Sequence, residues 1–114
     1  MTFDYAAQKA ETERLWAEIF ATGKAPSEGM VDLHFVPAEN ADSTEFIGWL
    51  EDNGYDVEHF ESGSFEEGDE DEVIEVQTDV MPLSAASIHD QERKTTEAAL
   101  RFGFRLTGWG VMGV

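Results

Sequence analysis

The sequence predicts an α+β fold in which two helices cover one face of a four-stranded antiparallel sheet. Two observations lead to this prediction. Four segments alternate apolar and polar residues with the period of a β-strand, and two helical patterns fall among them in the order β-α-β-β-α-β. Two β-α-β halves with right-handed crossovers, joined by a hairpin, give a sheet of order 4-1-3-2. This architecture is the ferredoxin-like βαββαβ sandwich, here preceded by an N-terminal amphipathic helix.

The 114 residues suit a single domain, with residues 1–23 as the N-terminal helix and residues 30–112 as the ferredoxin-like core. The chain has no cysteine, which excludes disulfides, thiolate metal sites and cysteine nucleophiles. Its first residues lack the basic start and apolar stretch of a signal peptide, and no apolar run approaches the roughly 20 residues of a membrane-spanning helix. We therefore expect a cytoplasmic protein without a membrane partner.

The first predicted element is a helix over residues 2–22, followed by Gly23, which can take the left-handed conformation that often terminates helices. The first strand follows over residues 30–36, where apolar and polar residues alternate until Pro37 stops the pairing. One side of the helix is apolar and must be covered. This side carries Tyr5, Thr12, Leu15, Trp16, Ile19 and Phe20.

The second helix is predicted to begin after Asp42, whose side chain can cap it, and to end at Gly54. The second strand occupies residues 55–60 and leads into an acidic segment that we expect to form a long hairpin tip. The strongest strand pattern covers residues 72–81 and predicts one central strand. The covered face of this strand would carry Ile74, Val76, Thr78 and Val80.

The third helix is predicted to be capped by Ser87 and to end at Gly103. The last strand then runs over residues 104–112. Strict alternation along this strand predicts that two residues, Phe104 and Leu106, face the helices. It places Arg105 and Trp109 on the opposite side of the sheet.

The second face of the predicted sheet is polar and has no helix of the core to cover it. The N-terminal helix is the only remaining element, and the sequence leaves open whether it lies on this face or at an edge. Trp109 is accordingly expected either to lie under this helix or to be exposed as an anchor for a partner. The residues expected on this face are Asp32, His34, Glu75, Gln77, Asp79, Arg105 and Trp109.

The charge of the chain indicates its partners. Against 25 acidic residues there are only 7 basic ones, which are scattered singly, and the net charge is −18. Nucleic-acid phosphates would be repelled, whereas a basic protein segment would be attracted. An acidity that only maintains solubility is the competing interpretation. The predicted partner-binding residues are Trp109 and the hairpin carboxylates Glu66, Glu67, Asp69, Glu70, Asp71 and Glu72.

No motif in the sequence predicts a cofactor, a metal or catalysis. Residues 108–113 have the glycine spacing of a dinucleotide-binding loop, but no helix follows to hold a pyrophosphate. The three histidines match no zinc motif, and the acidic segment lacks the ligand alternation of a calcium loop. We therefore expect a protein that is not an enzyme and binds neither cofactor nor metal.

The order and spacing of several short motifs resemble the bacterial family of the regulator of ribonuclease activity B, nearly from end to end. The resemblance begins with an acidic amphipathic helix that ends in a glycine-containing turn before Pro26. Gly108-Trp109-Gly110 in the last strand is its most diagnostic part. The other motifs are Leu33-His34-Phe35, Gly54-Tyr55-Asp56-Val57, Val73-Ile74, Asp79-Val80 and Ile88-His89-Asp90-Gln91.

The resemblance implies an acidic, non-catalytic ferredoxin-like domain that binds ribonuclease E and restrains its cleavage of messenger RNA. Two alternatives come from other classes of protein. One is a small-ligand-binding or enzymatic domain that uses the open sheet face, where Asp32, His34 and Arg105 could converge. The other is a homodimer in which two open sheets cover each other.

Overall fold

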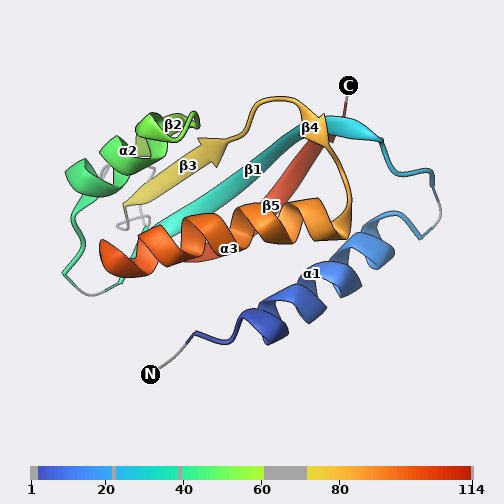
Figure 1. Cartoon of the computed structure of the whole chain (residues 1–114), viewed down its shortest axis with the longest axis horizontal. Coiled ribbons are helices and arrows are strands. Elements are labelled where there is room, and N and C mark those ends of the chain that lie inside the picture. The colour runs from blue at the N-terminus through green and yellow to red at the C-terminus, as the bar shows by residue number, and fades with distance from the viewer. Residues whose placement is uncertain (1–2, 22, 39, 61–71, 114) are drawn as a thin grey trace, which may run out of the picture.

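The computed structural model describes residues 3–21, 23–38, 40–60 and 72–113. Within these ranges the chain forms three helices and five strands (Figure 1). In chain order they are α1 (Tyr5–Ile19), β1 (Glu28–Pro37), α2 (Ser43–Asp52), β2 (Asp56–Phe60), β3 (Val73–Gln77), β4 (Met81–Pro82), α3 (Ala85–Arg101) and β5 (Phe104–Gly113).

The strands form one antiparallel sheet, in which β1 has the most partners. One edge of β1 pairs with β3, which in turn pairs with β2, and the other edge pairs with β5 along residues 29–37. The order β2-β3-β1-β5 is the predicted four-strand order, read from the opposite end. The structure adds β4, a two-residue strand that pairs with the start of β1.

The prediction of one continuous strand over residues 72–81 is wrong, because the chain leaves the ladder at Thr78. The Thr78 backbone N–H donates to the carbonyl oxygen of Val31 (3.0 Å), while Thr78 Oγ1 accepts from the Val31 N–H (3.0 Å). The hydroxyl thus replaces a backbone acceptor, and the main chain turns away before pairing resumes at Met81. Val80, expected on the covered face, is therefore 51% exposed.

Local hydrogen bonds explain where the helices begin and end. Asp42 caps α2 as predicted, accepting from the backbone N–H three residues further on (3.1 Å). The cap of α3 is Ser84 rather than Ser87, because the two serines form a reciprocal capping box. The helix therefore begins earlier than predicted. Gly54 and Gly103 follow α2 and α3 with φ of 85° and 80°, as expected for left-handed terminators.

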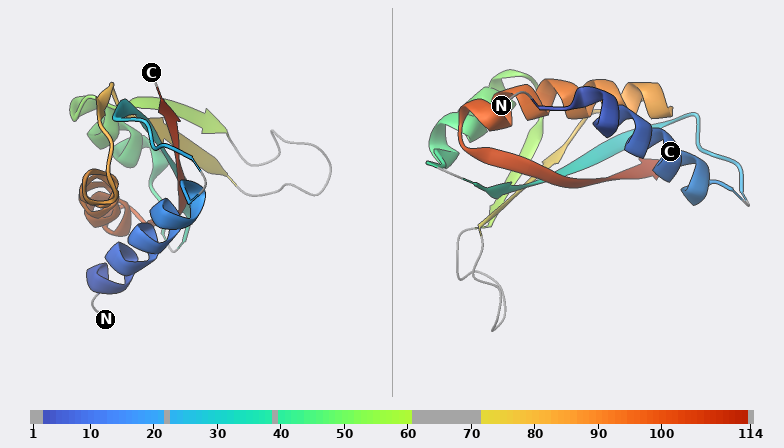
Figure 2. Two further views of the ribbon diagram at one scale, coloured as in Figure 1. Left: turned by 90° about the vertical axis from the view of Figure 1, so that its right-hand side faces the viewer. Right: turned by 90° about the horizontal axis from the view of Figure 1, so that it is seen from below.

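Helices α2 and α3 cover one face of the sheet and enclose the core with it (Figure 2). The ring of Phe46 in α2 lies 5.1 Å from that of Phe35 in β1, edge to face, and 5.1 Å from that of Phe104 in β5. These contacts join a helix to two neighbouring strands. The other fully buried apolar residues are Val31, Leu33, Leu50, Ile74, Ile88, Ala98 and Ala99.

Helix α1 packs beside α3 at the β5 edge, on the side of the sheet that carries the other helices (Figure 2). This position answers the question that the sequence left open. Two hydrogen bonds join α1 to α3: Gln8 Nε2 donates to Thr96 Oγ1 (3.1 Å), and the Thr12 hydroxyl donates to the buried carboxylate of Glu92. Trp16 of α1 is partly buried against the core. Ile19, at the end of α1, was predicted to be covered but is 55% exposed.

The predicted orientation of Trp109 is wrong, because β5 contains a β-bulge. Leu106 pairs with Phe35 and Gly108 pairs with His34, so Thr107 is one residue more than β1 can pair. Beyond this extra residue the alternation is shifted, and Trp109 pairs with Leu33 on the helix-covered face. It packs there, partly buried, against the core.

Candidate functional site

The open face of the sheet is hollowed over β1, β3 and β2, with a volume of about 760 Å³. Carboxylates dominate its lining. Among the described residues around it there is no lysine or arginine, and His34 is the only histidine. The acidic residues that line the hollow are Asp32, Glu51, Asp56, Glu58 and Glu75.

The strand register arranges these groups in rows across the sheet. His34 of β1 lies opposite Glu75 of β3, which lies opposite Glu58 of β2. The His34 Nδ1 is 3.9 Å from Glu75 Oε1, and both side chains are nearly half exposed. Carboxylates directly opposite each other on paired strands repel. The Glu75–Glu58 pair would therefore be stabilised by a cation above the sheet.

A second, parallel row has the same chemistry with one amide in it. Asp32 of β1, Gln77 of β3 and Asp56 of β2 lie side by side, and Gln77 Nε2 donates to Asp32 Oδ1 (2.9 Å). The amide thereby holds one carboxylate in place. The other carboxylate of this row, Asp56 on β2, lies at the edge of the sheet and is exposed. Together the two rows can accept hydrogen bonds from several donors at once.

Both rows end on β5 at glycines. Gly108 lies opposite His34 and Gly110 lies opposite Asp32. A Cβ atom at either glycine would meet nothing within 4 Å, so the internal packing does not require glycine there. Because these positions carry no side chains, the open face is flat on this side and accessible to a large partner.

Of the predicted partner-binding residues, the structure describes only Glu72 and Trp109, and it does not bring these two together. Five of them lie outside the described residues: Glu66, Glu67, Asp69, Glu70 and Asp71. Glu72 is described, and its carboxylate contacts His59 Nε2, with both side chains largely covered. Trp109 lies on the other face of the sheet. The hollow itself was missed as a site because its carboxylates are spread over three strands and α2, although four of its lining residues were expected on the open face.

The constellation proposed for a small ligand is not assembled as expected. Asp32 and His34 both line the hollow, but Arg105 does not, because it lies opposite Val36 beyond the bulge. Within residues 3–113 as far as they are described, no three histidine or acidic side chains are placed to hold a metal ion. The groups that do converge are mainly carboxylates.

The fold and this face define a small acidic α+β domain with an open, carboxylate-lined sheet. The model of one protein family, the regulator of ribonuclease activity B, matches residues 9–111. The chain therefore belongs to that family, a family of regulators of ribonuclease activity, as its motifs suggested. No curated protein matches the chain. None of the helices in the described ranges is both long and apolar enough to cross a membrane.

Proposed function

We propose that this protein is a non-catalytic regulator that binds ribonuclease E through a basic segment and inhibits its cleavage of RNA. The observation that supports this proposal most strongly is the family match over residues 9–111, because it covers almost all of the domain. A net charge of −18 supports a basic protein partner and disfavours direct binding to RNA. The proposed place of action is the cytoplasm, where ribonuclease E and its substrates meet.

The open face is the part of the described surface best suited to such a segment. Its hollow presents five carboxylates without a lysine or arginine among its described lining residues. Arginine guanidinium groups pair with carboxylates in two-pronged hydrogen bonds, each worth about 1.5–3 kcal/mol where water is excluded and less where it is not. The acidic run at residues 66–72 follows β2, which borders this hollow, and we propose that it adds to the same field.

The test compares two triple variants in binding to purified ribonuclease E. The open-face variant is Asp56→Asn, Glu58→Gln, Glu75→Gln, and the control removes three exposed acids from the helices, at Glu13, Asp90 and Glu97. Both change the net charge equally. We expect the open-face variant to bind at least about tenfold more weakly at low salt, and the control to bind nearly as well as the natural chain.

Inhibition of RNA cleavage by the same ribonuclease is the second readout, and it should fall in parallel with binding. Raising the ionic strength from about 50 to about 300 mM should weaken the complex, since screening shortens the reach of the carboxylates. No association of the natural chain with ribonuclease E at low salt would refute the proposed partner. Equal loss in both variants would refute the assignment to the open face.

A further inference from the structure

A second hollow, of about 500 Å³, lies on the opposite side of the sheet from the open face, between α1 and β5. Its walls are largely apolar, with Leu15 contributed by α1, and Leu106 and Trp109 by β5. At its base, α3 contributes Glu92, which is 5% exposed. We call this hollow the α1–β5 groove. It combines an aromatic wall with a nearly buried acid.

Glu92 has no cation among the described residues that line the groove. Its carboxylate accepts a hydrogen bond from the hydroxyl of Thr12. Burial raises the pKa of Glu92 to about 6, although the Thr12 hydrogen bond acts in the opposite direction. The group is therefore mostly ionised at neutral pH, in a place where an unpaired charge is unfavourable.

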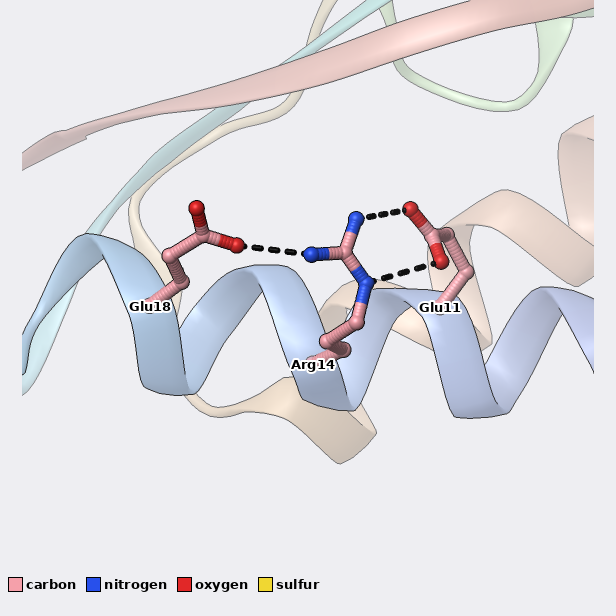
Figure 3. Close-up of polar contacts among 3 residues, drawn as sticks. All are labelled: Glu11, Arg14 and Glu18. Carbon is pink, nitrogen blue, oxygen red and sulfur yellow. Dashed lines mark hydrogen bonds and ion pairs between the residues drawn. The ribbon is translucent and has the colours of Figure 1, made fainter.

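The groove contains a further acceptor without a donor. Gln8 Oε1 is buried and has no hydrogen-bond partner among the residues that the structure describes, while the amide nitrogen of the same side chain donates to Thr96. An acid at the rim, Glu11, is paired already: Arg14 lies between Glu11 and Glu18 along α1 and bonds to both (Figure 3). The guanidinium of Arg14 is thus engaged by α1 itself and does not neutralise Glu92.

We propose that the α1–β5 groove receives a lysine or arginine side chain of the protein partner. The alkyl part of that side chain packs between Leu15 and Leu106, and its cationic head pairs with Glu92. This inference rests on the proposed function, because it assigns one side chain of the partner to one place on this domain. The site is separate from the open face and was not indicated by the sequence.

The chemistry of the groove selects this occupant over others. An apolar side chain would leave the carboxylate of Glu92 and the amide oxygen of Gln8 without donors from the partner, at a cost in desolvation. An anion would be repelled by Glu92 and by Asp4, which also lines the groove. A cationic side chain with an alkyl stem can pack its stem against the apolar walls and pair its charge with Glu92. A guanidinium also stacks favourably on an indole such as that of Trp109.

The first experiment uses small probes and needs no ribonuclease. The indole N–H signal of Trp109, assigned with a Trp109→Phe variant, is followed by NMR at pH 7.5 during titration with N-acetyl-arginine methylamide or N-acetyl-lysine methylamide. We expect a saturable shift with at least one of these, and none with the uncharged norleucine analogue. Glu92→Gln should weaken the interaction by about tenfold, as expected for loss of one charged hydrogen-bonded pair.

The matched control is Glu97→Gln, which removes one exposed carboxylate from the same helix outside the groove and should leave the Trp109 response unchanged. The proposal is overturned if Trp109 does not respond to either cation, if norleucine acts equally, or if Glu97→Gln weakens binding as much as Glu92→Gln does. The proposed partner is tested separately by titrating ribonuclease E into both variants. Failure of the natural chain to bind it refutes the partner alone, whereas equal binding by Glu92→Gln overturns the role of the groove.

Discussion

Replacing Glu92 by glutamine should stabilise the protein at alkaline pH and flatten its pH dependence. The carboxylate has a pKa of about 6 in the folded chain, against an ordinary value of 4.5, because it is buried beside α1. That difference corresponds to about 2 kcal/mol. The raised pKa means that the folded state holds this proton more tightly than the unfolded state does. The contribution of Glu92 to stability is therefore fully present below pH 4.5 and is lost as the pH rises through 6.

Of that loss, about 1 kcal/mol falls between about pH 5 and pH 8. Glutamine has nearly the same shape and can still accept the hydrogen bond from Thr12, but it carries no charge at any pH. The free energy of unfolding of the Glu92→Gln variant, relative to the natural chain, should therefore rise by about 1 kcal/mol between these two pH values.

Urea unfolding followed by tryptophan fluorescence measures this difference at pH 5 and pH 8. Glu97→Gln is the control, because Glu97 lies on the same helix with its side chain 58% exposed. The control should change by less than about 0.5 kcal/mol relative to the natural chain at both pH values. If Glu92→Gln shows the same relative stability at pH 5 and pH 8, the reasoning about its burial is refuted.

Three further results are expected. Gly110→Val should raise stability by about 0.5–1 kcal/mol in urea unfolding, because valine favours strands and its Cβ meets open space, and it should weaken ribonuclease E binding by obstructing the open face. Destabilisation by this change would contradict the account of the glycine. Ser84→Ala should lower stability by about 1 kcal/mol, because it removes the cap of α3. The control Ser27→Ala, at an exposed serine outside the helices, should change stability little. Equal effects of the two substitutions would exclude the capping role. Native mass measurement at low salt should give a monomer of 12.7 kDa, because two open faces in contact would bring together the four strand acids of each copy. A stable dimer would support the homodimer alternative instead.

Much of the fold could be predicted because its signals are local. The alternation in β1 requires only that one face of a strand be buried, and Val31, Leu33 and Phe35 are indeed fully buried. The helix ends at Gly54 and Gly103 were predictable from a conformation that glycine adopts easily. Strand order then followed from the handedness of the crossovers.

The errors arose where a side chain or an extra residue changed the pairing. Thr78 interrupts the strand by using its hydroxyl as an acceptor, which no alternation pattern reveals. The extra residue at Thr107 reverses the orientation of Trp109, and strict alternation cannot detect it. The α1–β5 groove depends on how a separate helix packs, through Thr12 and Glu92, and such a polar contact has no periodic signal in the sequence.

The bulge in β5 also bears on how this strand can change in length. Thr107 is the one residue between Phe104 and Gly113 that β1 does not pair, so its removal would restore a regular ladder with Trp109 still inward and the glycines still outward. Removal of a residue between Phe104 and the bulge would instead shift the alternation of the strand. Residues on one side of the deletion would then change to the other face of the sheet. Among related chains, a one-residue gap should therefore be tolerated at this point and selected against a few positions earlier.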